Sequence, residues 1–238
     1  MRMKWFLLVL SVLASSLGLC AEDNLWFIEQ DFVKFGKKDA YEKYKKEMLS
    51  NRIGTFSTFA VQADDSLQYI YLVPVKDYCG LGDFLQKRSD YEQSLHSESK
   101  APYFSTLNFT IGSLQRYLPD CSYVPKGKEA LTAYRNIYFY LFSIAPGNEE
   151  VLEARLQKIA EEQEQNSGVC FRSWKIVIGS NVPKYLVTVF ATGEKQVQKR
   201  AEELEVIDLT MKNIVLTQKQ GSAILRKDLS TMKGKNGG

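Results

Sequence analysis

The chain has 238 residues, enough for one large domain or two small ones. Hydrophobic residues make up 45% and charged residues 25%, a composition that excludes disorder, collagen and coiled coil as descriptions of the whole chain. The net charge of +3 becomes +1 without residues 1–20, which contain Arg2 and Lys4 and no acid. A nearly neutral chain gives no electrostatic reason to expect nucleic acid as a partner.

The first twenty residues have the pattern of a secretory signal peptide. Arg2 and Lys4 precede a largely apolar stretch from Trp5 to Ala14, and small residues follow it. The apolar stretch is too short to span a bilayer, which needs about 20 residues. We therefore expect an exported protein, periplasmic or associated with the cell envelope, without a transmembrane span.

Two kinds of processing fit the end of this segment. Gly18 and Cys20 suit the small residues that precede an ordinary cleavage site. Residues 17–20 also resemble a bacterial lipoprotein signal, in which Cys20 would be lipidated and would anchor the protein to a membrane. Leu19 departs from that pattern, which prefers a small residue before the cysteine.

Three cysteines follow Cys20, namely Cys79, Cys121 and Cys170. They allow at most one internal disulfide, and their spacing matches no zinc or redox motif. We predict that each is a small buried apolar residue. Neither a metal site nor a cofactor is expected.

The remainder of the chain contains an internal repeat. Four segments recur in the same order, displaced by about 110 residues: 32–38 with 143–149, 56–61 with 171–176, 67–73 with 183–189, and 112–122 with 221–230. This similarity predicts a tandem duplication with a first repeat at 21–123, a linker at 124–133, a second repeat at 134–230 and a frayed tail at 231–238.

The predicted elements have the same order in both repeats. Aromatic and β-branched residues predict a first strand, an amphipathic helix follows a glycine turn, and a hairpin, a second helical region and a closing strand complete the repeat. In the first repeat these elements are expected at 25–34, 38–52, 56–61, 67–73, about 80–111 and 113–118. In the second repeat they are expected at 136–144, 149–165, 171–176, 183–189, about 193–212 and 222–227.

The order β-α-β-β-α-β is that of the ferredoxin-like arrangement. Its antiparallel sheet carries helices on one face and needs cover on the other. Two such sheets in one chain can cover each other. The predicted fold class is therefore α+β, with two ferredoxin-like repeats forming one intramolecular α+β barrel.

The repeated combination of a strand, a glycine turn, an amphipathic helix, an F-x-x-F or F-x-x-W segment and a tyrosine-rich strand resembles the dimeric α+β barrel superfamily. The nearest groups are antibiotic-biosynthesis-monooxygenase-like and NIPSNAP-like proteins. The resemblance implies a barrel closed within one chain, since members normally close it by dimerising. It also implies relatives among secreted bacterial proteins of unassigned function. Sheet edges left unpaired would allow a homodimer.

Strand alternation separates two faces of the first strand. Trp26, Ile28, Gln30 and Phe32 are expected under the helices, and the alternate residues, including Glu29 and Asp31, inside the barrel. The same phase and the tyrosine-rich strands predict a ligand site lined by Tyr69, Tyr71, Tyr138, Tyr140, Arg172 and Tyr185.

Each set of candidates has two interpretations. Glu29 and Asp31 are either a carboxylate pair with one raised pKa, able to act as a base, or solvated acids at a sheet edge. The tyrosines are either ligand contacts or half-buried packing residues with wet hydroxyls. His96, the only histidine, lies in the general region where haem-handling members of the superfamily have a ligand, but its surroundings are mostly polar.

Three functions are compatible with these features. The first is binding of a small apolar or aromatic molecule between the sheets. The second is a cofactor-independent monooxygenase or isomerase that uses Glu29 or Asp31 as its base. The third is a structural or interaction role at the cell envelope. The fold by itself does not choose among them.

Overall fold

The computed structural model describes residues 24–50, 59–63, 67–94, 103–126, 134–180, 182–204, 206 and 211–230. The predicted signal peptide, the lipidation candidate Cys20, most of the predicted linker, His96 and the predicted tail lie outside these ranges.

Each half of the chain folds into four strands and two helices. The first half contains β1 (Leu25–Val33), α2 (Lys38–Ser50), β2 (Phe59–Ala63), β3 (Gln68–Val75), α3 (Tyr78–Ser94) and β4 (Leu107–Tyr117). The second half contains β5 (Asn136–Ile144), α5 (Glu149–Gln165), β6 (Phe171–Ile178), β7 (Lys184–Ala191), α6 (Glu194–Glu203) and β8 (Val215–Leu225). Three single-turn 3-10 helices are η1 (Pro119–Cys121), η3 (Met211–Asn213) and η4 (Lys227–Leu229).

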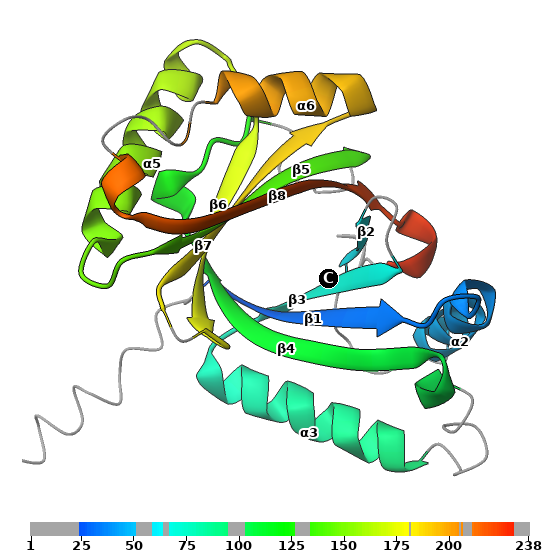
Figure 1. The fold of residues 1–238 in the computed structure, drawn as a ribbon. Helices are drawn as coiled ribbons and strands as arrows, with labels where there is room; N and C mark the ends of the chain where they lie inside the picture. Colours follow the sequence, from blue (N-terminus) through cyan, green and yellow to red (C-terminus); the bar gives the residue numbers. More distant parts are fainter. Residues whose placement is uncertain are drawn as a thin grey trace, which may run out of the picture.

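The eight strands form one closed barrel in the order β1-β3-β2-β8-β5-β7-β6-β4. Every strand pair is antiparallel, and each half contributes four adjacent strands. The halves meet where β2 pairs with β8 and where β4 pairs with β6. The helices lie outside the barrel, α2 and α3 against the first half and α5 and α6 against the second (Figure 1). The predicted fold class is confirmed.

Equivalent glycines form the turn between the first strand and the first helix of each half. Gly36 and Gly147 adopt φ angles of 73° and 85°. Side chains other than glycine adopt such positive angles only at a cost, so this turn favours glycine in both halves.

The faces of the first strand are the reverse of the prediction. The ring of Phe27 lies 5.4 Å from that of Phe84 on α3, and Asp31 accepts a hydrogen bond from Tyr41 on α2, so this set faces the helices. Trp26 instead meets Trp174 inside the barrel. The phase could not be read from the sequence because both faces of β1 carry large aromatic residues, and because partners on α2 make the outward acids compatible with burial.

The closing strands are longer than predicted. β4 begins at Leu107, in a region expected to be helical, and β8 begins at Val215, ahead of the strand expected at 222–227. The first part of each strand is largely exposed and pairs only with β1 or β5. This exposed part therefore lacks the pattern of a buried strand, which is why the sequence did not predict it as strand in either half.

Within the part of the chain that the structure describes, Cys79, Cys121 and Cys170 form no disulfide. Cys121 and Cys170 are buried as predicted, whereas Cys79 is exposed at the start of α3, which corrects that prediction. Within the described ranges, no helix combines the length and the apolar character needed to cross a membrane.

Candidate functional site

Helix α2 covers the outward face of β1 and β3, and the interface between them contains a buried ion pair. The Lys45 ammonium lies 3.0 Å from Asp31 Oδ2 and 3.2 Å from Glu29 Oε1. It also lies 4.1 Å from the centre of the Tyr71 ring, a cation–π distance. All four side chains are buried. The two acids proposed as a catalytic pair are thus brought together, but on the helix side of the sheet.

Three hydroxyl groups complete the surroundings of Asp31. Tyr41 and Tyr103 donate to Oδ2 at 2.7 and 2.9 Å, and Thr110 donates to Oδ1 at 2.7 Å. The Tyr41 hydroxyl also lies 2.9 Å from that of Tyr71. Both carboxylate oxygens of a fully buried aspartate are therefore occupied by donors from α2, β4 and the segment before β4.

The electrostatics of this cluster keep Asp31 ionised. Burial alone would raise the pKa of Asp31, but Lys45 and the hydroxyl donors outweigh it and hold that pKa below its usual range. Burial raises the pKa of Tyr71 to about 12, so this phenol stays protonated. Asp31 is therefore not the member of the pair with a raised pKa, and the burial of both acids contradicts the alternative of solvated acids at a sheet edge. An ionised carboxylate with every oxygen occupied orders its neighbours rather than taking up a proton from a substrate.

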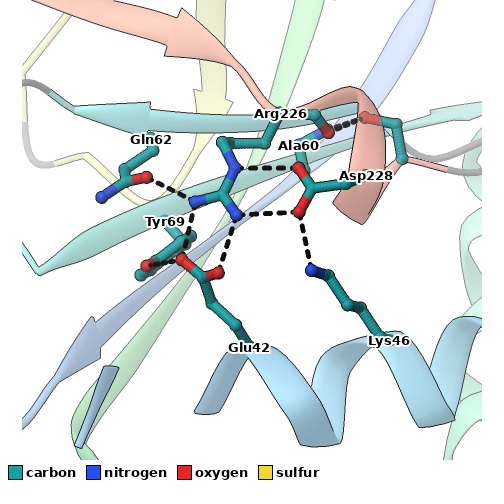
Figure 2. A network of polar contacts seen from close by, with 8 residues as sticks. Glu42, Lys46, Ala60, Gln62, Tyr69, Arg226 and Asp228 are labelled. Carbon is teal, nitrogen blue, oxygen red and sulfur yellow. Dashed lines mark hydrogen bonds and ion pairs between the residues drawn. The ribbon is translucent and has the colours of Figure 1, made fainter. Parts of the chain in front are cut away.

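A second polar network ties the C-terminal end of the barrel to α2 (Figure 2). Arg226 forms two hydrogen bonds with Glu42, at 2.6 and 2.7 Å, and two with Asp228, both at 2.9 Å. Its Nη1 also donates to Gln62 on β2 at 2.6 Å. Lys46 on α2 reaches Asp228 at 2.9 Å. This network fastens the end of the second half to the first half.

The inward face of the barrel has a different character. Several inward side chains in the middle of the strands are partly exposed, whereas the residues beneath the helices are mostly buried. The partly exposed residues include Trp26, Leu72, Phe139, Leu141, Leu186 and Thr188. A solidly packed barrel would bury both faces alike. Solvent therefore reaches the interior of this barrel.

The two ends of the barrel differ in packing. Where β5 begins, the interior is filled by a cluster of buried side chains, Val61, Tyr134, Ile137, Cys170, Phe190, Ala223 and Leu225. Where β1 and β5 end, Phe109 and Ile111 are 53% and 45% exposed, and Phe109 stacks on Phe32 with ring centres 4.3 Å apart. The interior is thus filled by buried side chains at one end and bordered by exposed side chains at the other, accessible end.

Aromatic and polar groups meet inside the barrel near the seam between β4 and β6. Trp174 contacts Trp26 edge to face at 5.4 Å and the ring of Tyr117 at 5.1 Å. The Arg172 guanidinium lies 5.8 Å from the Tyr117 ring, within cation–π range. Gln115 is the neighbour of Trp26 across the β1–β4 pair.

Two buried polar atoms on inward residues of β4 have no hydrogen-bond partner among the described residues. They are Gln115 Oε1 and Ser113 Oγ, on side chains that belong to residues only 3% and 8% exposed. Buried polar groups usually have hydrogen-bond partners, so each of these atoms lacks a partner that it would be expected to have. A ligand inside the barrel that carries a donor group would supply this partner.

The predicted ligand residues fall into two groups. Arg172 points into the barrel, as expected. The five tyrosines point outward, which corrects their predicted direction: Tyr69 and Tyr71 face α2, Tyr185 faces α5, and Tyr138 and Tyr140 pack against the core cluster beneath α5 and α6. Tyr69 and Tyr185 donate hydrogen bonds to Glu42 and Glu153.

The predicted ligand site does not include the inward residues Trp26, Gln115, Tyr117 and Trp174. Their signal was present in the alternation of β4 and β6, where Gln115, Tyr117, Arg172 and Trp174 occupy positions of one phase. Which of the two alternating sets of a strand faces inward, however, depends on the strands and helices that pack beside it. Lys45 was also missed, because a lysine within a charged helix normally faces solvent.

No family model and no curated protein matches this chain. Solved structures of the same fold do. A candidate monooxygenase from Fusobacterium nucleatum subsp. nucleatum aligns with a TM-score of 0.57 at 11% identity, over 84% of this chain and 91% of that one. An anthrone oxidase-like protein aligns with a TM-score of 0.55 at 11% identity, over 87% of this chain and 93% of that one.

A mutant chlorite dismutase from Candidatus Nitrospira defluvii aligns with a TM-score of 0.53 at 6% identity, over 88% of this chain and 94% of that one. At such low identities these similarities establish the fold and not the activity. The protein therefore has an α+β barrel fold like that of these structures, and its barrel is closed by two ferredoxin-like units of a single chain.

Proposed function

We propose that the protein binds a small molecule with an aromatic or apolar body inside the barrel. The observation that carries this proposal is the partial exposure of inward aromatic and apolar side chains, beside two buried polar atoms of β4 without partners. Mostly apolar walls with a few convergent polar groups are typical of ligand sites.

Tryptophan fluorescence gives a direct test. Of the three tryptophans, Trp26 and Trp174 lie inside the barrel, and the third, Trp5, belongs to the predicted signal segment. A naphthalene probe such as N-phenyl-1-naphthylamine should quench this fluorescence saturably and accept energy from it. Substituting Trp174→Phe should reduce the energy transfer to the bound probe. Absence of saturable binding by the folded protein would overturn the proposal.

The enzymatic alternative receives no support from the proposed base. Asp31 is ionised and surrounded by donors, and Glu29 is paired with Lys45. A base needs both access to a substrate and a pKa suited to proton transfer. The interior site, by contrast, needs only access and complementary surfaces.

We propose in addition that the protein is exported through its first twenty residues and that it can form a homodimer. The support for export is the sequence pattern of residues 1–20. The support for dimerisation is that residues 107–113 of β4 and 216–221 of β8 pair with a neighbouring strand on one side only. Native mass spectrometry of the protein from its own cells would read the mature N-terminus, a lipid on Cys20 and the oligomeric state together.

A further inference from the structure

The charges on the strands are sorted by face. Glu29 and Asp31 are the only acidic residues on the eight strands, and both point outward into the interface with α2. No acidic side chain of the described strands points into the barrel.

The inward basic residues are distributed along the barrel. Arg172 lies deep, beside Tyr117 and Phe190. Lys184 and Lys219 alternate with outward residues and lie opposite Ser143 and Leu141 of β5, toward the accessible end. Every charge that the described strands direct into the interior is therefore positive.

This distribution sets the sign of the electrostatic potential in the interior. Clefts lined by charges of one sign with apolar walls concentrate the field and attract ligands of the opposite charge. The walls here are aromatic and apolar. Trp174 lies two residues after Arg172 on β6, and Trp26 contacts Trp174. A guanidinium presents a planar set of donors that matches a carboxylate or sulfonate.

We propose that the ligand is an organic anion with a flat apolar body, whose acid group is bound by Arg172 and whose ring system lies against Trp26 and Trp174. This inference rests on the proposed function, because it names the chemical class of the molecule that the interior binds. Gln115 Oε1, an acceptor without a partner, further selects a hydroxyl or amine donor on the body of the ligand. The lysines at the accessible end increase the rate at which an anion enters.

Two probes with the same ring system separate charge from apolar contact. N-phenyl-1-naphthylamine is neutral, and 8-anilinonaphthalene-1-sulfonate adds a negative group to that scaffold. Because hydrogen bonds to charged groups contribute more than neutral ones, we expect the sulfonate to bind the folded protein at least about tenfold more tightly at low salt. Energy transfer from the interior tryptophans reports the location of each probe.

Two variants complete the experiment. Arg172→Met removes the interior charge and should abolish the preference for the sulfonate while leaving the affinity for the neutral probe within about twofold. Lys175→Met is the matched control, since it removes an equal charge three residues further along β6, from a side chain that pairs with Glu153 on the helix side. It should retain the preference. Thermal unfolding of each variant shows that both fold.

The outcomes separate the two levels of the proposal. Equal binding of both probes by the unmodified protein would overturn the choice of an anion and leave the binding function intact. A preference that survives Arg172→Met or is lost in Lys175→Met would overturn the role of Arg172. Binding of neither probe would overturn the binding function itself. A preference that depends on Arg172 and weakens with salt would support the complete inference.

Discussion

The two halves of the barrel use the same backbone arrangement with opposite chemistry beneath their first helices. Asp31 pairs with Tyr69 in the first half, and Phe142 pairs with Tyr185 at the corresponding register in the second. Nine residues beyond the glycine turn, α2 carries the buried Lys45, and α5 carries Leu156 at that position. One interface is an ion pair among hydroxyls, and the other is an apolar core.

One contact is kept in both halves. Tyr69 donates to Glu42 on α2, and Tyr185 donates to Glu153 on α5. In each case a tyrosine from the third strand of its half is bonded to a glutamate on the first helix. The comparison shows that this fold tolerates either a polar or an apolar interface under the helix, provided that the buried polar groups have partners.

The largest expected effect comes from breaking the ion pair of the first half. Asp31→Asn removes the acid while Lys45 stays buried, and loss of one partner of a buried pair typically costs about 3–5 kcal/mol. We expect the free energy of unfolding to fall by this order in urea titrations. Asp39→Asn, at an exposed position of α2, is the control and should change it by less than about 0.5 kcal/mol.

A triple variant would sharpen this comparison. Glu29→Gln, Asp31→Leu and Lys45→Leu together give the first half an apolar interface like that of the second. Replacing a buried ion pair by apolar residues of similar volume is often neutral or stabilising, so most of the stability lost in Asp31→Asn should return. A triple variant as unstable as Asp31→Asn would mean that the polar cluster is required by this half of the fold.

The network around Arg226 should have the next largest effect. Arg226→Met removes bonds to Glu42, Asp228 and Gln62, and hydrogen bonds to charged groups contribute about 1.5–3 kcal/mol. Because the network is partly exposed, we expect a loss near the lower end of that range, measured by thermal and urea unfolding. Arg226→Lys should restore only a part, since an ammonium lacks the planar fork of donors. Full restoration by lysine would show that charge alone is needed.

The stability of the protein should depend on pH through two carboxyl groups of the first half, Asp31 and Glu42. Lys45 and the hydroxyl donors outweigh burial at Asp31, and the Arg226 hydrogen bond lowers the pKa of Glu42 despite its partial burial. Carboxyls with a lowered folded pKa contribute stability above their unfolded pKa, and this contribution is lost as pH falls through the folded value. Stability should therefore decline from about pH 5 downward, and Asp31→Asn should flatten the decline. Parallel curves for both proteins would contradict an ionised Asp31.

The smallest effects are expected from the conserved contact of the two halves. Tyr69→Phe and Tyr185→Phe each remove one hydrogen bond to a glutamate and should each cost about 1 kcal/mol. The contacts lie in different halves and share no partner, so the double variant should show the sum. A markedly larger cost for Tyr69→Phe would indicate that its loss also disturbs Arg226, which binds the same Glu42.

The order of elements was predictable because it depends on local patterns. Gly36 and Gly147 follow strands rich in aromatic residues and precede helices. This repeated pattern of strand, turn and helix predicted two ferredoxin-like units. The candidate site was predicted only in part. Arg172 was selected correctly as an inward residue, and the five tyrosines were assigned to the wrong face.

The chain by itself determined the composition of each strand, the turns between strands and helices, and the duplicated order that makes a closed barrel. Only the tertiary structure decided which face of each strand is inside, because both faces of β1 carry aromatic residues. Alternation separates the residues of a strand into two faces but does not say which face points inward. That phase depends on partners distant in sequence. Lys45 makes the outward position of Asp31 favourable, and Trp174 gives Trp26 its contact inside the barrel.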